Sequence, residues 1–540
     1  MNLVVGSGPA GVAAALALLE RGQSVTMLDV GREIEPEAAD IPRQLAGLPF
    51  EAWPPESYRR LAAITGPVTN GFPMKTNFGS DFAWRPEPDL MPLEVRGADI
   101  LVSFARGGLS NLWGSNVFSF CAEDFRRWPF GAAALEPAYR AVLRHIPLSA
   151  SRGDDLERLL PLHTDRLEPR LLSQQATRVL RDLEAHREGL QARGVSFGPS
   201  RLGLRTSASS NDPGCVRCGL CLHGCPYDLI YNSAHTLAAL ERDPRFRYAG
   251  GLYVTRFAES RDGVELEALR TADRARQRFS GARVFLACGA YSTARLVLES
   301  LERFAVEATM LESQYFLIPM LHGDATPGVA RERLQTLSQI CLRLRDREVC
   351  AEDVHMLLYT YTHLYRTVLD ASPARFIPGL ARALEGRLLA LQGYLHSDLS
   401  PRLALSLRRA GSGPPTLAVS GRPQPGTVPA IRRIEARLRS LGASLRASPI
   451  PFMTKIAPPG KSYHVGGVFP MRREPGALES DALGRPLGLT RVHAVDSSVF
   501  TTIPATNLTL TVMANAYRIA AESCTLERPA TGAGAARVPA

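Results

Sequence analysis

Two kinds of hydrophobic spacing alternate along this 540-residue chain. Residues 3–5 form a short apolar run that predicts a buried strand, residues 10–21 predict a helix, and residues 24–28 predict a second strand that ends before Asp29. A strand at 284–287 and a helix from about Ser292 repeat this order. Such strand–loop–helix units are typical of a parallel sheet in an α/β fold.

Residues 305–460 carry shorter, mostly alternating apolar runs, which predict an antiparallel sheet. A hairpin is expected over 255–269, amphipathic helices over 174–192 and 428–443, and a strand over 491–496 before a helix through 511–521. The tail, residues 529–540, has the composition of a disordered segment.

One further helix is expected within residues 374–395, where apolar residues recur at helical spacing among arginines. The apolar positions are Ile377, Leu380, Leu384, Leu388 and Leu391, and the arginines are Arg375, Arg382 and Arg387. Packing against the core or a second copy is the commoner role of such a helix, and peripheral contact with a membrane surface is the alternative.

The charge of the chain and the distribution of its basic residues limit the kinds of partner that it is expected to bind. The net charge is +10, but lysine occurs only at Lys75, Lys455 and Lys461, and the arginines are scattered. We therefore expect a solvated surface and no nucleic-acid partner. Residues 3–19 are uncharged, yet they lack a basic leader and contain Gly and Pro, so we expect a cytoplasmic protein without a signal peptide.

The first loop carries a G-x-G-x-x-G pattern at Gly6, Gly8 and Gly11. The first glycine permits a tight turn, the second lets the backbone approach a pyrophosphate, and the third lets helix and strand pack closely. Asp29 lies at the distance where a carboxylate can bind a ribose. This context predicts a dinucleotide site, with a glycine-rich turn in an ordinary βαβ unit as the alternative. A second glycine-rich stretch brackets Ser110 and Asn111, which suits close approach to a ring system, with a simple turn as the alternative.

Four cysteines, Cys215, Cys218, Cys221 and Cys225, stand as C-x2-C-x2-C-x3-C and are followed by proline. This is the ligand run of bacterial ferredoxins, so an iron–sulfur cluster with three or four of these ligands is expected. A structural zinc and a group of reduced or disulfide-paired thiols remain alternatives.

Five stretches together resemble the glucose–methanol–choline family of FAD-dependent oxidoreductases. They are GSGPAG at 6–11 with Asp29, GGLSNLWG at 107–114, CGAYSTARLVL at 288–298, HVGG at 464–467 and VDSSVFTTIPATNLTLTVMANAYRIA at 495–520. CPYDLIYNSA after the cysteines is most similar to the branch of bacterial sugar dehydrogenases that carries an iron–sulfur cluster, although the cysteine spacing differs. Asp29 stands where many members have Glu, and Leu508 replaces a common proline.

The resemblance implies an α/β fold, α+β overall, in which a Rossmann-like FAD-binding domain is interleaved with an antiparallel-sheet substrate domain. The implied FAD-binding domain comprises 1–35, 95–125, 205–304 and 461–528. A lid at 36–94, a helical insertion at 126–204 and the substrate domain at 305–460 complete the division. The implied FAD-binding residues are Gly6, Gly8, Pro9, Ala10, Gly11, Asp29, Gly107, Gly108, Ser110, Asn111, Gly289, Asp496, Ser497 and Asn507.

The implied reaction is the oxidation of a CH–OH group of a small-molecule alcohol or sugar. His464 would take the hydroxyl proton, Asn507 would hold the oxygen, and FAD would accept the hydride. Electrons would then leave through the cysteine cluster, which makes a dehydrogenase the first expectation. An oxygen-using oxidase without a cluster and a non-catalytic flavoprotein are the alternatives. Tyr359, Tyr361, Tyr394 and His396 are candidates for a substrate pocket, with packing in the sheet as the alternative.

Overall fold

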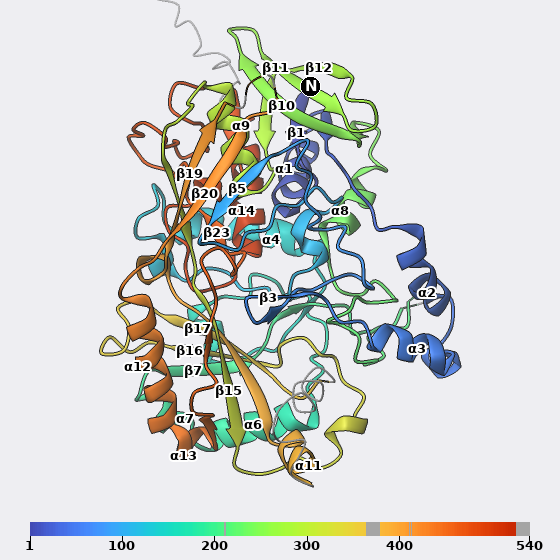
Figure 1. The fold of residues 1–540 in the computed structure, drawn as a ribbon, viewed down its shortest axis with the longest axis vertical. Coiled ribbons are helices and arrows are strands. Elements are labelled where there is room, and N and C mark those ends of the chain that lie inside the picture. Colours follow the sequence, from blue (N-terminus) through green and yellow to red (C-terminus); the bar gives the residue numbers. More distant parts are fainter. Residues whose placement is uncertain (210–211, 363–378, 410, 412, 525–540) are drawn as a thin grey trace, which may run out of the picture.

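The computed structural model describes residues 1–209, 212–362, 379–409, 411 and 413–524 (Figure 1). Its upper half in Figure 1 is built on a sheet whose neighbouring strands all run parallel. In spatial order the strands are β24 (Val492–Ala494), β13 (Arg283–Leu286), β1 (Asn2–Val5), β2 (Val25–Leu28) and β9 (Phe246–Ala249). Strands from both ends and the middle of the sequence therefore complete one sheet.

Both faces of this sheet are buried. Successive side chains of β1 point to opposite sides of the sheet, and each side packs against a different apolar core. Val4 packs into the apolar core formed with α1 (Pro9–Glu20) and α14 (Thr509–Ser523). Leu3 and Val5 pack into the core formed with α9 (Ala290–Ser300) and the antiparallel strands β10 (Leu252–Glu259), β11 (Val264–Arg270) and β12 (Arg276–Gly281). The α/β fold class predicted from the sequence is confirmed.

A seven-stranded sheet lies toward the other end of the molecule (Figure 1). Its main path is β21 (Ala447–Pro449), β15 (Tyr315–His322), β18 (Leu388–Tyr394), β17 (Val354–Tyr359), β16 (Ile340–Leu344) and β7 (Val195–Pro199), and β22 (Lys455–Ile456) also pairs with β15. Its pairs are antiparallel. Apolar residues of α6 (Gln174–Ala185) and α12 (Thr427–Ser440) pack against it.

A third sheet lies in the upper half of Figure 1, where apolar residues of its strands share a core with the parallel sheet. Its strands are β23 (Val465–Gly466), β14 (Ala308–Glu312), β19 (Arg402–Arg408), β20 (Thr416–Arg422) and β5 (Leu93–Arg96). The short strand β23 directly follows His464 and pairs with β14. This pairing fixes the backbone beside the predicted base.

The prediction of a helix within 374–395 is wrong for most of the residues in this range that the structure describes. Helix α11 spans only Leu380–Glu385, and the chain then forms strand β18. From Leu388 the apolar pattern also has a period of two, which places Leu389 and Leu391 on the buried face of the sheet. Pairing on both sides with β15 and β17 then outweighs the helical spacing. Residues 374–378 of this prediction lie outside the described part of the chain.

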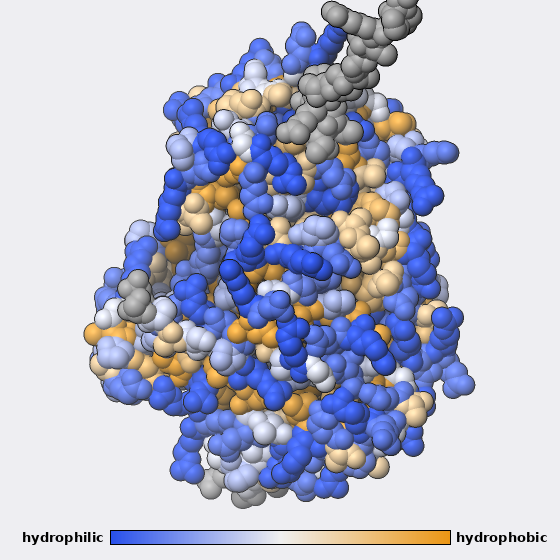
Figure 2. Space-filling view, turned by 180° about the vertical axis from the view of Figure 1, so that it is seen from behind, coloured by the Kyte–Doolittle hydropathy of each residue, from blue (hydrophilic) through white to orange (hydrophobic). Residues whose placement is uncertain are grey.

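The segment 126–204, expected to be helical, contains α4 (Glu136–Leu143), α5 (Asp155–Leu159), α6 and α7 (Arg187–Gln191), but it also supplies strand β7. Segment 36–94 contains α2 (Pro36–Ala46) and α3 (Pro55–Ala62). The domain boundaries themselves stay a prediction, and tail residues 529–540 lie outside the described chain. Among the residues that the structure places, no helix combines the length and apolar character needed to cross a bilayer. The face drawn in Figure 2 is mostly hydrophilic, with scattered hydrophobic residues.

Candidate functional site: a dinucleotide cavity and a buried His–Asn pair

The glycine loop lies between β1 and the start of α1. Gly6 has a φ of +100°, and a Cβ there would lie 2.5 Å from the carbonyl oxygen of Ala287. A Cβ at Gly11 would lie 1.9 Å from the carbonyl oxygen of Gly6. Gly8, by contrast, has open space beside it and lines a cavity. The loop is therefore tight against the protein on one side and open at the helix N-terminus, which fits a pyrophosphate.

This cavity, hereafter the cofactor cavity, extends from the glycine loop to His464. The predicted site residues that line it are Gly6, Gly8, Pro9, Ala10, Asp29, Gly108, Gly289, His464, Asp496 and Ser497. The lining does not include Gly11, Gly107, Ser110, Asn111 or Asn507. The first group forms part of the cavity wall, whereas most of the second group supports the loops around it.

The stretch at 107–111 illustrates this support. Gly107 N donates to Ser7 Oγ at 2.9 Å, Ser110 Oγ donates to Gly107 O at 2.6 Å, and Asn111 Nδ2 donates to Gly108 O at 2.8 Å. These bonds hold the second glycine loop against the first. Of the residues involved, Ser7 was not predicted from the sequence, because a serine between two glycines carries no distinctive signal.

Asp29 directly follows β2 and lines the cofactor cavity. Its carboxylate accepts hydrogen bonds from Ser7 Oγ and from the Tyr248 hydroxyl, the latter at 3.1 Å. Burial raises the pKa of Asp29 to about 6, although both hydrogen bonds act in the opposite direction. Tyr248 comes from β9, which is 219 residues away in the sequence.

Asp496 links two segments of the cavity wall. Its carboxylate accepts from Gly289 N at 2.9 Å, from Thr293 Oγ1 at 2.5 Å and from Ser498 N at 3.0 Å. Burial raises its pKa, and these hydrogen bonds lower it. Thr293, four residues after Gly289 in helix α9, is a supporting residue that the sequence analysis missed.

His464 lines the cofactor cavity. Its ring stacks on Tyr394 of β18, with 4.6 Å between the ring centroids. Burial lowers the pKa of His464 to about 4, so the imidazole is neutral at pH 7. Its Nδ1 atom is buried without a hydrogen-bond partner in the described structure. A neutral imidazole whose orientation is fixed by ring stacking can accept a proton.

A second buried histidine, His355 on β17, connects His464 with Asn507. The pKa of His355 is lowered to about 3, first by burial and then by electrostatic interactions with Arg343 and His464, and the Asn507 side chain acts in the opposite direction. His355 therefore lies within interaction range of both His464 and Asn507. Asn507 Oδ1 is buried without a partner in the described structure. The only sequence signal for His355 is a polar residue in the alternating run of β17.

Of the aromatic candidates for a substrate pocket, Tyr394 contacts His464 directly. Tyr315, which was not predicted, stacks on Tyr394 at 5.7 Å between centroids. Tyr359 packs in the same apolar cluster, and Tyr361 is buried. His396 lines a separate polar pocket described below.

The four cysteines of the 215–225 run line one cavity of about 10 Å³, which is room for about one water molecule. Within the described residues, no three Cys, His, Asp or Glu side chains are grouped closely enough to hold a metal ion. Burial raises the pKa of Cys215 and Cys218 to about 12. This arrangement gives the predicted metal site no support among the described residues.

Comparison with known proteins gives two informative matches, whereas no protein-family model matches the chain. A relative from Streptomyces lividus named 6'''-hydroxyparomomycin C oxidase is 26% identical over 555 residues, covering 95% of this chain and 89% of that protein. The crystal structure of pyridoxine 4-oxidase from Mesorbium loti matches with a TM-score of 0.58 and 15% identity, covering 96% of this chain and 98% of that one. Both similar proteins are named as oxidases, and the second match shows a shared fold.

Proposed function

We propose that this chain, a flavoenzyme of the glucose–methanol–choline type, oxidises a CH–OH group of a small-molecule alcohol and passes the electrons to oxygen. One observation carries the proposal: the cofactor cavity runs from the glycine loop to a buried, neutral His464, and His355 interacts with both His464 and Asn507. The oxidase names of the two similar proteins favour oxygen as the acceptor over an electron relay.

Each residue of the site has a separate role in the proposed reaction. FAD, when bound in the cofactor cavity, supplies the acceptor for the hydride. His464 takes the hydroxyl proton, and stacking on Tyr394 fixes the orientation of its ring. Asn507 donates an amide N–H to the alcohol oxygen as negative charge develops there. Asp496 holds the two loops that face the cofactor. The alcohol loses two electrons and two protons, and oxygen receives them as hydrogen peroxide.

The test uses the flavin-loaded enzyme with 6'''-hydroxyparomomycin C and pyridoxine as the first alcohols, since the names of the two similar proteins specify them. We expect stoichiometric hydrogen peroxide in air and flavin bleaching without air. His464→Ala should lower the rate of flavin reduction by about 10²–10⁴-fold. His186→Ala, at the C-terminal end of α6, is the matched control.

Two results would contradict the proposal. Equal activity of His464→Ala and the wild type would favour a non-catalytic flavoprotein. Reoxidation of the reduced flavin that is much slower in air than with a one-electron dye would favour a dehydrogenase.

An iron–sulfur relay is the second candidate, and the observation in its favour is that all four thiols of the ferredoxin-like run line one cavity. The loop would have to open for a cluster to fit. Metal analysis after anaerobic purification decides the matter. Less than about half an atom of iron per chain removes the relay.

A further inference from the structure

The ring of His464 is the inner end of a row of four aromatic rings. It stacks on Tyr394 with 4.6 Å between the ring centroids, Tyr394 stacks on Tyr315 at 5.7 Å, and Tyr315 contacts Phe72 at 5.1 Å. Each spacing lies in the range where ring pairs attract one another beyond the burial of their surface. We call these four side chains the aromatic row.

Stacking matters for the proposed base because no hydrogen bond fixes the imidazole at Nδ1. This atom of His464 is buried without a partner in the described structure. In enzymes that use a histidine base, a third group bonds to the imidazole and sets its orientation. Ring stacking takes that place at His464, so the orientation of the base depends on the rest of the aromatic row.

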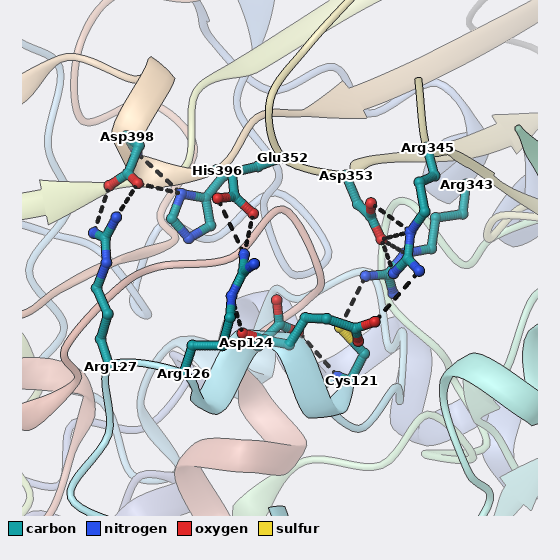
Figure 3. Close-up of polar contacts among 11 residues, drawn as sticks. Cys121, Asp124, Arg126, Arg127, Arg343, Arg345, Glu352, Asp353, His396 and Asp398 are labelled. Atoms are coloured by element: carbon teal, nitrogen blue, oxygen red, sulfur yellow. Dashed lines mark hydrogen bonds and ion pairs between the residues drawn. The ribbon is translucent and has the colours of Figure 1, made fainter. Parts of the chain in front are cut away.

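Tyr394 is supported by the seven-stranded sheet. It lies on β18 directly opposite His355 of β17. Residues of β16 and β17 also line the polar pocket that contains His396, and charged side chains around this pocket pair with one another (Figure 3). Arg343 of β16, for example, pairs with Asp353 at 2.7 Å. Strand pairing and ion pairs therefore hold this part of the row in place.

Phe72, at the outer end of the row, belongs to a much smaller element. It lies in the hairpin of β3 (Val68–Thr69) and β4 (Phe72–Pro73). Asn70 and Gly71 join the strands with φ angles of +51° and +79°, as a two-residue type I′ turn requires. Phe72 is only 4% exposed, so its ring is on the inner side of the hairpin. A hairpin of two short strands is not stable alone, so its position depends on its contacts.

Lys461 joins this hairpin to the segment that carries the base. Its Nζ atom donates to Thr69 Oγ1 and to Met74 Sδ, and its side chain is buried. The Tyr463 hydroxyl also donates to Met74 Sδ, at 3.2 Å. Tyr463 directly precedes His464 in the sequence and lines the cofactor cavity with it. The bonds that hold the hairpin therefore begin at the wall of the cofactor cavity.

The other two lysines of the chain bind at the same place. Lys455 Nζ donates to Gly71 O at 3.0 Å, and Lys75, just after β4, donates to Trp113 O at 3.2 Å. An ammonium group is a compact charge that suits single acceptors of this kind. The lysines of this arginine-rich sequence are thus gathered around the hairpin.

We propose that Phe72 is a positioning residue for His464: the hairpin, docked through Lys461, places Phe72 against the aromatic row, and the row holds the imidazole in the orientation that accepts the hydroxyl proton. The inference rests on the proposed function, because it takes His464 as the base. It adds a control of that site, since an undocked hairpin removes the outer ring and leaves the imidazole free to turn.

The first experiment removes single rings from the row and observes His464 directly. The flavin-loaded protein is labelled with ¹³C at the Cε1 atom of histidine, and the His464 signal is identified by its loss in His464→Ala. Phe72→Leu and Tyr315→Leu should shift or broaden this signal, whereas Tyr315→Phe, which keeps the ring, should leave it in its wild-type position. Phe50→Leu is the matched control, because Phe50 contacts Trp53 and lies outside the row.

The same variants are compared in the rate of anaerobic flavin reduction by pyridoxine and by 6'''-hydroxyparomomycin C. Phe72→Leu and Tyr315→Leu should lower the limiting rate about threefold to tenfold, the equivalent of one lost ring pair. The alcohol concentration that gives half of this rate should change little, because the row orients the base and not the alcohol. Tyr315→Phe and Phe50→Leu should keep the wild-type rate.

Proteolysis tests the docking through Lys461. A lysine-specific protease can cut the chain only after its three lysines, and a cut after Lys75 requires the hairpin segment to open. Lys461→Met should speed the cut after Lys75 about tenfold or more, as expected for a lost hydrogen bond from a charged group. Thr69→Val, which removes one acceptor, should act in the same direction. Equal cutting of both variants and the wild type would overturn the docking.

The outcomes separate this inference from the proposed function. An unchanged His464 signal in Phe72→Leu and Tyr315→Leu overturns the inference, and so does an equal change in Tyr315→Phe. If the signal changes as expected but neither alcohol reduces the flavin, the aromatic row stands and the function fails. If Phe72→Leu reduces the flavin at the wild-type rate, the function stands and the positioning role is overturned. Should Phe72→Leu fail to fold, the comparison of Tyr315→Leu with Tyr315→Phe still decides.

Discussion

Glu312 offers a quantitative test of how strongly the protein around His464 is desolvated. It ends β14 and pairs with Val465, the residue after His464. Its side chain is buried, Oε2 accepts from Gly460 N at 2.6 Å, and Oε1 has no partner in the described structure. Burial raises the pKa of Glu312 from 4.5 to about 8. The folded protein therefore keeps this carboxyl protonated at pH 7.

The sign of the pH effect follows from proton binding. Between about pH 4.5 and pH 8 the unfolded chain ionises Glu312 while the folded chain holds the proton. The folded state is thus penalised by about 1.4 kcal/mol for each pH unit, and this part of the stability is lost as pH rises. Between pH 5 and pH 7 the penalty amounts to about 3 kcal/mol. Glu312→Gln removes the titration, keeps an acceptor for Gly460 N and should therefore gain stability relative to the wild type as pH rises.

Thermal unfolding of the flavin-loaded proteins, followed by tryptophan fluorescence at one scan rate, measures this effect. The difference in Tm between Glu312→Gln and the wild type should grow by a few degrees from pH 5 to pH 7. Glu51→Gln, whose side chain is 73% exposed, controls for the loss of a surface charge and should show no such trend. A Tm difference that stays constant or shrinks with pH would refute the reasoning.

Three further predictions concern the cofactor and the base. Because burial lowers the pKa of His464 to about 4, the acid limb of kcat/KM should fall near pH 4; a limb near 6.5 would contradict a buried, neutral imidazole. Gly11→Ala places a Cβ against Gly6 O, so the purified protein should carry little FAD by absorbance, whereas Gly131→Ala, which has open space, should stay fully loaded. Asp496→Asn removes the charge that accepts from Gly289 N and should weaken FAD binding about tenfold or more in fluorescence titrations; unchanged affinity would show that this carboxylate does not organise the loop.

The sequence predicted those parts of the structure that depend on local pattern. The apolar run at 3–5, the glycine spacing after it and the helix that follows are encoded within about thirty residues, and the structure contains them. Residues 388–394 show the limit of this approach. Their leucines satisfy a helical and a strand period equally, and pairing with β15 and β17 decides between the two.

The partners of the site residues could not be predicted for a different reason. Tyr248 reaches Asp29 and Thr293 reaches Asp496 only after segments about two hundred residues apart have paired, and neither residue carries a local signal. The role of His355 likewise depends on residues that are distant from it in the sequence. The cysteine run shows the converse: its spacing is specific, but the spacing alone does not set how far apart the sulfur atoms lie.

The packing of α1 against α14 has a consequence for biosynthesis. The first helix of the chain completes its core only when residues 509–523 have been made. At roughly 5–20 residues per second, a ribosome needs roughly 30 to 100 s for the whole chain. Throughout that time the nascent Leu16, Leu18 and Leu19 lack their final partners and offer a surface to chaperones. Flavin loading should therefore follow synthesis of α14, and a chain truncated before Thr509 should yield aggregated, colourless protein.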